Sequence, residues 1–248
     1  MAAVVHLHRP DTAVAVIEMA DREGRNTFTR ALVAGLGDAL ARIAGDDAVR
    51  VVVIHGFDAI FCAGGTLEEL LTLADSRATF DAHDFFRALL DCPLPVVAAM
   101  QGHALGGGLV FGLYADLVVL SQESLYAANF MKYGITPGMG ATALLPRKLG
   151  EALAAEMMFT ARGYHGGVLR ERGIGMPVVP RAETVPTALR LAQDLAGHAP
   201  AALRLLKQTL TAPLREALPA AVARERAMHE ACFAQPGIAA RIAERFGQ

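Results

Sequence analysis

The first two thirds of the chain alternate short β-branched apolar runs with segments of helical periodicity. The apolar runs that predict strands lie at residues 4–8, 14–19, 51–55, 96–100 and 117–120. Helical spacing occupies residues 30–43 and 85–90, and a further helix is expected to begin within residues 106–108 and to end near residue 114. This alternation predicts an α/β fold with mainly parallel strands.

The last third of the chain has a different pattern. From about Thr184 the sequence is rich in Ala, Leu and Arg and has helical periodicity, with breaks expected at residues 199–200, at Pro213 and at Pro236. One face of this region is too apolar to remain exposed. We therefore expect a single domain, with a core at residues 1–190 and a C-terminal helical region at residues 191–248 that closes the site and supports oligomerisation.

Composition excludes several classes of function. The net charge of −2 gives no electrostatic reason for binding nucleic acid or an anionic membrane. No apolar stretch approaches the roughly 20 residues of a membrane span, and the N-terminus lacks the pattern of a signal peptide. The odd set of Cys62, Cys92 and Cys232 predicts neither a disulfide framework nor a metal site. We expect a cytoplasmic protein.

Two glycine-containing segments follow predicted strands and begin predicted helices. The first includes Gly64 and Gly65, and the second runs from Gly102 to Gly108. Small residues let a ligand approach backbone N–H groups, and the beginning of a helix favours negative charge. Two such loops can direct two N–H groups at one oxygen, forming an oxyanion hole in which each donor contributes about 3 kcal/mol to the transition state. Taken alone, either segment is also compatible with a tight turn or with close packing.

The paired segments, with Asn26 and residues 133–140, resemble the enoyl-CoA hydratase (crotonase) superfamily along nearly the whole chain. The resemblance implies a crotonase fold, which is a spiral of ββα units with a C-terminal helical region. It assigns the two oxyanion N–H groups to Gly65 and Gly107. It also implies a thioester substrate, no metal or other cofactor, and a homotrimer or a dimer of trimers.

Two residues depart from the hydratase pattern. Hydratases of the superfamily use two glutamates, and this chain has Val110 and Phe130 at their positions. Without that acid–base pair, the addition or removal of water should be badly impaired. Loss of CO₂ from a glutaconyl-type thioester still requires the oxyanion hole, because it leaves a dienolate. Apolar walls at these two positions would not repel the substrate carboxylate as two glutamates would.

The segments at residues 100–108 and 128–142, together with residues 228–230, are similar to the decarboxylating enoyl-CoA hydratase homologues of polyketide β-branching cassettes. That similarity implies the conversion of a 3-methylglutaconyl thioester to a 3-methylcrotonyl-type thioester. The acyl group would arrive on the phosphopantetheine of an acyl carrier protein, or on coenzyme A, after a partner dehydratase has acted. The pathway implies antibiotic biosynthesis.

The resemblance also implies an active-site histidine and an active-site lysine. His229 matches the histidine, and helical spacing predicts that it points inward. The position of the lysine holds Thr79, and Arg77, two residues away, is the candidate replacement. Lys132 matches the family pattern near the pocket. Two alternatives remain open at this stage, namely an enoyl thioester isomerase and a non-catalytic crotonase-fold interaction subunit.

Overall fold

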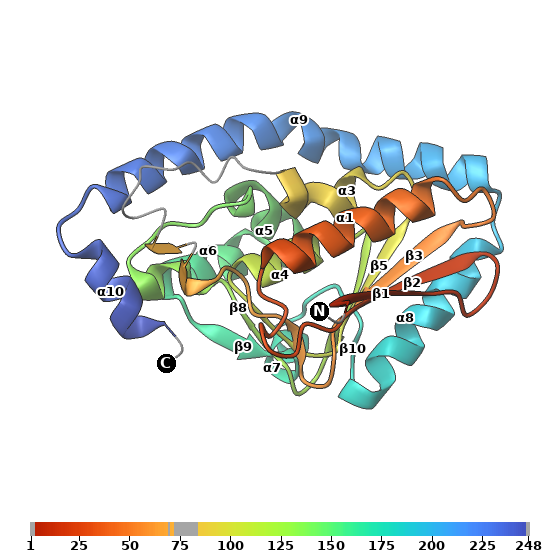
Figure 1. Ribbon diagram of the computed structural model, residues 1–248, viewed down its shortest axis with the longest axis horizontal. Coiled ribbons are helices and arrows are strands. Elements are labelled where there is room, and N and C mark those ends of the chain that lie inside the picture. Colours follow the sequence, from red (N-terminus) through yellow and green to blue (C-terminus); the bar gives the residue numbers. More distant parts are fainter. Residues whose placement is uncertain (1–2, 69, 72–83, 247–248) are drawn as a thin grey trace.

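Two β-sheets form the centre of the computed structural model, which describes residues 3–68, 70–71 and 84–246 (Figure 1). The larger sheet has the order β1-β2-β3-β5-β7-β10 and the smaller one β4-β6-β8-β9. Neighbouring strands are parallel except in the pairs β1–β2 and β8–β9. The strands are β1 Val5–His8, β2 Val14–Met19, β3 Val51–His55, β4 Ile60–Cys62, β5 Val96–Met100, β6 His103–Leu105, β7 Leu117–Ser121, β8 Leu125–Ala127, β9 Gly163–His165 and β10 Val178–Val179.

Strands that are consecutive in the sequence are divided between the two sheets. β3, β5 and β7 lie side by side in the larger sheet, and the strand that follows each of them, β4, β6 or β8, lies in the smaller sheet. Each of these pairs leads into a helical segment. The repetition is the expected spiral of ββα units, which confirms the predicted α/β class.

Helices cover the sheets, and one long helix runs across the molecule (Figure 1). The helical segments are α1 Arg30–Ala44, η2 Asp84–Arg87, α3 Ala88–Asp91, α4 Gly107–Leu113, η3 Asn129–Tyr133, α5 Ala141–Leu149, α6 Glu151–Thr160, α7 Gly166–Glu171, α8 Arg181–Ala196, α9 Pro200–Phe233 and α10 Ile238–Arg245. Residues 67–68 and 70–71 are also helical. None of the helices in the described part of the chain is both long and apolar enough to cross a membrane.

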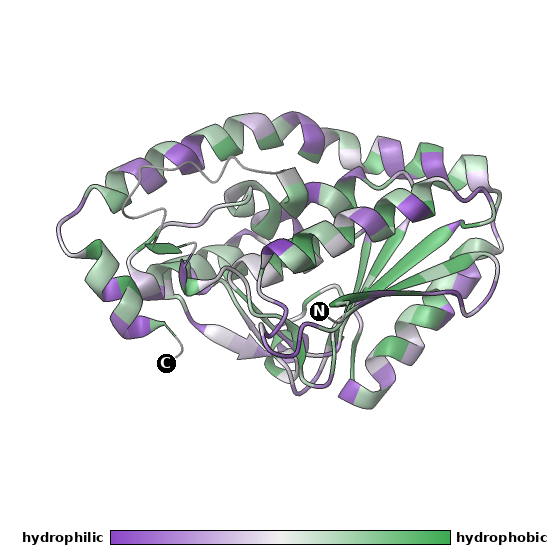
Figure 2. Cartoon of the chain, viewed as in Figure 1, coloured by the Kyte–Doolittle hydropathy of each residue, from purple (hydrophilic) through white to green (hydrophobic). Residues whose placement is uncertain are grey.

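Both faces of the larger sheet are buried. In β3, Val52 and Ile54 face the main core, whereas Val51 and Val53 pack against the apolar face of α8. Successive side chains of a strand point to opposite faces, so a strand covered on both sides must be apolar throughout. Figure 2 shows the central strands coloured hydrophobic along their length. This is the physical reason for the unbroken apolar runs in the sequence.

The structure confirms the longer strands and helices predicted in the first 120 residues, with nearly the same bounds. The segment at residues 85–90 is helical but is divided between η2 and α3. The short strands of the smaller sheet and β10 were not predicted, because two or three residues carry too little periodicity. Thr29 begins α1 by accepting a hydrogen bond from the N–H of Leu32 through its side chain.

The predicted helix break at Pro213 is wrong. α9 continues through both Pro213 and Pro219 and ends at Phe233. Proline removes one backbone N–H and disfavours a helix interior, but packing can override that cost. Here Leu214 and Leu218 are buried in the main core, which holds the stretch of helix between the two prolines.

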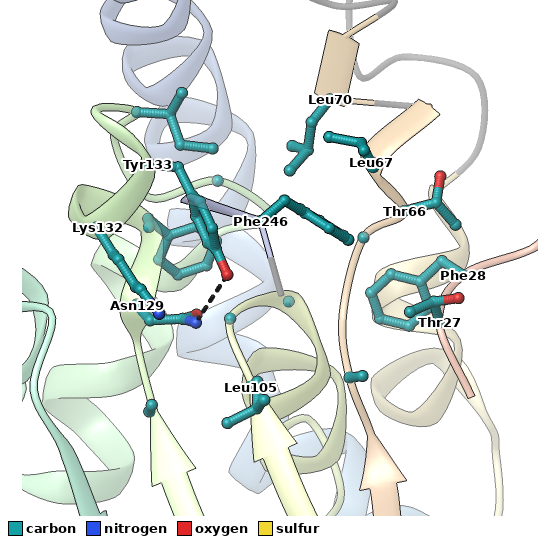
Figure 3. Close-up of a pocket in the computed structure, with 18 of the residues that line it drawn as sticks. Thr27, Phe28, Thr66, Leu67, Leu70, Leu105, Asn129, Lys132, Tyr133 and Phe246 are labelled. Carbon is teal, nitrogen blue, oxygen red and sulfur yellow. Dashed lines mark hydrogen bonds between the residues drawn. The ribbon is translucent and has the colours of Figure 1, made fainter. Parts of the chain in front are cut away.

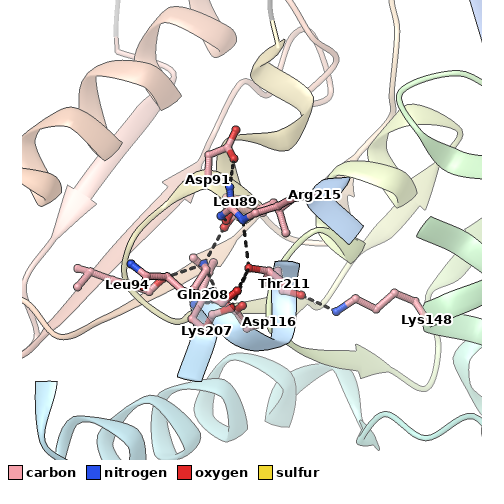
Figure 4. A network of polar contacts seen from close by, with 12 residues as sticks. Leu89, Asp91, Leu94, Asp116, Lys148, Lys207, Gln208, Thr211 and Arg215 are labelled. Atoms are coloured by element: carbon pink, nitrogen blue, oxygen red, sulfur yellow. Dashed lines mark hydrogen bonds and ion pairs between the residues drawn. The ribbon is translucent and has the colours of Figure 1, made fainter. Parts of the chain in front are cut away.

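A polar network attaches the first half of α9 to the sheet (Figure 4). Lys207 is 5% exposed, and its Nζ lies 2.8 Å from a carboxylate oxygen of Asp116. The same ammonium donates to the carbonyl oxygens of Leu89 and Leu94 at 3.0 and 2.9 Å. Asp116 also accepts from the N–H of Val96 at the beginning of β5. All three protons of the buried ammonium therefore have acceptors, which is the condition for burying a charge.

We predict that Lys207→Met lowers the free energy of unfolding by about 3 kcal/mol, because it leaves the carboxylate of Asp116 without its cation. Arg190→Met is the matched control. Arg190 lies 3.8 Å from Glu183 in a pair that is 61% and 56% exposed, and its loss should cost under ~1 kcal/mol. Urea unfolding of both variants measures the difference, and equal stabilities would contradict an anchoring role for Lys207.

Candidate active site

A cavity of about 590 Å³ opens between the two sheets and the end of the chain, and Figure 3 shows part of its lining. Its walls come from four regions. These are the loop between β2 and α1, the segment after β4, the segment from β6 to the beginning of α4, and residues 129–139. The cavity is also lined by Leu125 and Ala127 of β8, by Ala161 and Gly163, by His229 of α9 and by Phe246 after α10. The cavity therefore combines the carboxyl ends of β4 and β6 with the C-terminal helices.

The two glycine segments touch each other beside this cavity. Gly64 has a φ of +88°, and a Cβ atom on it would lie 2.6 Å from the carbonyl oxygen of Leu105 and 3.4 Å from the backbone nitrogen of Gly107. A Cβ atom on Gly65, in contrast, would have no atom within 4 Å. Gly65 therefore faces open space, while Gly64 makes the close backbone contact that only glycine permits.

Gly107 is the first residue of α4, and side chains pack closely against it. A Cβ atom there would lie 2.7 Å from Sδ of Met139 and 2.9 Å from Cε2 of Phe28. The N–H groups of the first helical turn have no acceptor within the helix. Gly65 and Gly107 line the same cavity, as their assignment to one oxyanion hole requires.

Asn26 holds the first of these loops in place. This residue is fully buried with a φ of +52°, and its amide nitrogen donates to the carbonyl oxygens of Met19 at 2.9 Å and Phe61 at 3.0 Å. Its backbone carbonyl accepts from the thiol of Cys62. Burial raises the pKa of that thiol to about 12, so Cys62 stays protonated. Asn26 consequently ties the end of β2 to β4.

The second half of α9 carries His229, which contacts the segment 136–142 at the cavity. Nε2 of His229 lies 2.8 Å from the carbonyl oxygen of Thr136. A carbonyl can only accept, so Nε2 of His229 carries the proton in this contact. A Cβ atom on Gly138 would lie 2.6 Å from Cε1 of the imidazole. Since Met139 packs against Gly107, this short segment places the imidazole next to the oxyanion wall.

Glu225, one helical turn before His229, fixes the same segment to α9. Its carboxylate is 2% exposed and accepts from the backbone N–H groups of Gly140 at 2.7 Å and Thr142 at 2.8 Å, and from the hydroxyl of Thr142. From the other side, the hydroxyl of Tyr114 donates to the carbonyl oxygen of Met139. The segment opposite Gly107 is therefore held by hydrogen bonds from both α4 and α9.

The predicted site residues differ in where the structure places them. Gly65, Gly107, Phe130 and His229 line the same cavity. Val110 is fully buried in the main core and lies behind the cavity wall rather than at its surface. Val110 is not among the described residues that line the cavity, and Phe28 and Met139 lie against Gly107 at the beginning of its helix. Thr79 and Arg77 lie outside the described residues.

Several residues that the structure places at the site carried no sequence signal of their own. Glu225 was indistinguishable from the other charged residues of a long helix, and Met139 lay within a turn rich in glycine. Tyr133 and Asn129 line the cavity, and the amide nitrogen of Asn129 lies 3.4 Å from the Tyr133 hydroxyl oxygen. Within the described part of the chain, no three His, Cys, Asp or Glu side chains cluster in a way that could hold a metal ion.

A comparison of the sequence with models of known protein families agrees with the observed fold. The family model described as enoyl-CoA hydratase/isomerase matches residues 9–243. The chain belongs to this family, which is the crotonase superfamily expected from the two glycine segments.

The similarity extends to particular relatives. The chain is 43% identical to the bacillaene synthase decarboxylase PksI of Bacillus subtilis over 245 residues, covering 99% of this chain and 98% of the relative. A solved structure from a dehydratase/decarboxylase enzyme couple involved in polyketide β-branching superposes with a TM-score of 0.96 at 43% identity, covering 99% and 100%. The ECH2 decarboxylase domain of CurF from Lyngbya majuscula has a TM-score of 0.94 at 41% identity, with the same coverage.

The oxyanion wall can be tested at Gly65 with two substitutions. Gly65→Pro removes the N–H, whereas Gly65→Ala keeps it and adds a methyl group where the structure has open space. We predict that the proline variant turns over a thioester substrate about 10²–10³-fold more slowly than the alanine variant. Melting curves must show that both variants fold. Equal rates in two folded variants would mean that the N–H of Gly65 does not act on the substrate.

Proposed function

We propose that this protein decarboxylates a 3-methylglutaconyl thioester, carried on the phosphopantetheine of an acyl carrier protein, to a 3-methylcrotonyl-type thioester. The single observation that carries the proposal is an oxyanion wall, Gly65 and Gly107, in a cavity whose described lining contains no carboxylate. The 43% identity to a decarboxylase over almost the whole chain supports it. Coenzyme A would serve as a surrogate carrier, and no cofactor takes part.

The chemistry requires little from the protein besides charge stabilisation. The bond between the γ carbon and the carboxylate breaks, and its electron pair passes through the double bond to the thioester oxygen. The N–H groups of Gly65 and Gly107 hold the resulting dienolate oxygen. Protonation at the γ carbon then gives the α,β-unsaturated product, and protonation at the α carbon gives the β,γ isomer.

His229 is the residue we assign to the carboxylate or to the proton. The carbonyl of Thr136 accepts a hydrogen bond from Nε2 and so fixes the orientation of the ring. Phe130 contributes an apolar wall. From the segment that follows Gly65, we retain Thr79 and Arg77 as candidates for the role of the family lysine.

We further propose that residues 191–248 form a helical region that closes the site on the core at residues 1–190 and supports a homotrimer or a dimer of trimers. His229 and Phe246, both from this region, line the cavity. Leu205, Leu206 and Leu210 of α9 are between 56% and 71% exposed in the single chain, a face that association would cover. The partners would be an acyl carrier protein and an upstream dehydratase homologue, as part of antibiotic biosynthesis.

The proposal predicts release of CO₂ from 3-methylglutaconyl thioesters and no appreciable hydration of crotonyl-CoA. The reason for the second part is that neither Val110 nor Phe130 can activate water. Headspace CO₂ and mass spectrometry of the acyl group measure the first reaction, and loss of enoyl absorbance measures the second. Robust hydration of crotonyl-CoA, or no CO₂ from the carboxylated thioester, would refute the proposal.

For His229 we predict that the alanine variant loses at least about 10²-fold in turnover, the range of a positioned acid or base, while its melting temperature changes little. The small change in melting temperature is expected because the ring is only half-buried. His198→Ala, on the exposed turn between α8 and α9, is the matched control and should keep full activity. Full activity per folded molecule in His229→Ala would make this residue structural.

A further inference from the structure

The described lining of the cavity contains several side chains that can donate a hydrogen bond to an anion. It contains no Asp or Glu, and its ionisable side chains are those of Arg25, Lys132, Tyr133 and His229. The substrate of the proposed function carries one free carboxylate at the end of the acyl group opposite the thioester, and a hydrogen-bond donor must receive it. Phe130 cannot donate a hydrogen bond, and the side chain of Arg25 is exposed. Beside His229, which is already assigned to the carboxylate or to the proton, Lys132 and Tyr133 remain as donors in the lining.

Tyr133 is placed to be this donor. Its ring is half-buried at the end of η3 and runs along one wall of the cavity, with the hydroxyl directed toward Asn129 and the beginning of α4 (Figure 3). Asn129 connects it to the oxyanion loop, because the amide oxygen of Asn129 lies 3.0 Å from the position of a Cβ atom on Gly106. One side-chain amide thus separates the phenol from the residue that precedes Gly107.

The contact with Asn129 determines how the hydroxyl can be used. The amide nitrogen of Asn129 donates to the phenolic oxygen at 3.4 Å, so this contact occupies a lone pair of Tyr133 and leaves its proton for another acceptor. Burial raises the pKa of Tyr133, with the Asn129 hydrogen bond as a smaller opposing effect, so the phenol remains neutral. The arrangement provides a neutral O–H donor beside the oxyanion wall.

We infer that Tyr133 determines specificity for a carboxylated acyl group, by donating a hydrogen bond to the carboxylate that leaves as CO₂. This inference rests on the proposed function and assigns to Tyr133 the recognition of the substrate carboxylate. A neutral donor orients the carboxylate without neutralising its charge. The electron pair of the breaking carbon–carbon bond can therefore still pass to the thioester oxygen at Gly65 and Gly107, while the carboxylate leaves as neutral CO₂ and a proton replaces it on carbon.

The test uses equilibrium binding of two saturated thioesters that differ only by the carboxylate, 3-methylglutaryl-CoA and isovaleryl-CoA. Neither has the double bond that would accept the electrons of decarboxylation. Tyr133→Phe should weaken binding of 3-methylglutaryl-CoA by about 10- to 100-fold, the range of a hydrogen bond to a charged group, and leave isovaleryl-CoA within about twofold. Tyr164→Phe is the matched control, because its hydroxyl binds Glu156, and it should bind both ligands as the wild type does. Isothermal titration measures all the affinities.

Three results would overturn the inference. They are unchanged binding of both ligands by Tyr133→Phe, an equal loss for both, and failure of the wild-type protein to bind the carboxylated thioester. Because binding is measured without turnover, the outcome is separate from that of the CO₂ assay. A wild-type protein that releases CO₂ while Tyr133→Phe binds normally would leave the proposed function standing and remove Tyr133 from it.

Discussion

The close contact between two stretches of backbone is the constraint on which the site depends. Gly64 approaches the carbonyl of Leu105 and the nitrogen of Gly107 so closely that no side chain fits between them. Gly108 packs in the same way, since a Cβ atom on it would lie 2.2 Å from the carbonyl oxygen of Cys62. Strand β4 and helix α4 are thereby joined backbone to backbone. This packing fixes the segments that carry Gly65 and Gly107 relative to each other, which the proposed oxyanion hole requires.

Polar groups buried along α9 fix the position of this long helix relative to the two glycine segments. Lys207 attaches its first half to the strand ends through Asp116, and Glu225 attaches its second half to the segment that carries Gly140 and Thr142. Burying a carboxylate or an ammonium is unfavourable unless every hydrogen-bonding position is used. Each attachment is therefore specific for one register of the helix, and the register decides where His229 points.

Long sequence patterns predicted their elements of the fold, and short patterns did not. Long strands buried on both faces, such as β3, and the glycine segments gave strong local signals. The smaller sheet did not, because strands such as β6 span three residues. The predicted helix break at Pro213 was wrong because helix propensity, which is a local property, does not include the packing of Leu214 and Leu218 in the core. Glu225 could not be found, because its hydrogen bonds are made with residues far away along the chain. Tyr133 belongs to a segment that carries the family resemblance, but the sequence does not reveal its contact with Asn129.

The distance along the chain between the partners of Glu225 and His229 has a consequence for how the enzyme is made. Their hydrogen bonds span 85 and 93 residues, whereas the two glycine loops are about half as far apart in sequence. Contacts between remote segments form late, because more chain entropy must be lost before they contribute. During synthesis the oxyanion loops can thus fold before α9 has left the ribosome. The hydrogen bonds that Glu225 and His229 make with residues 136–142 can form only after the last turns of α9 have been made.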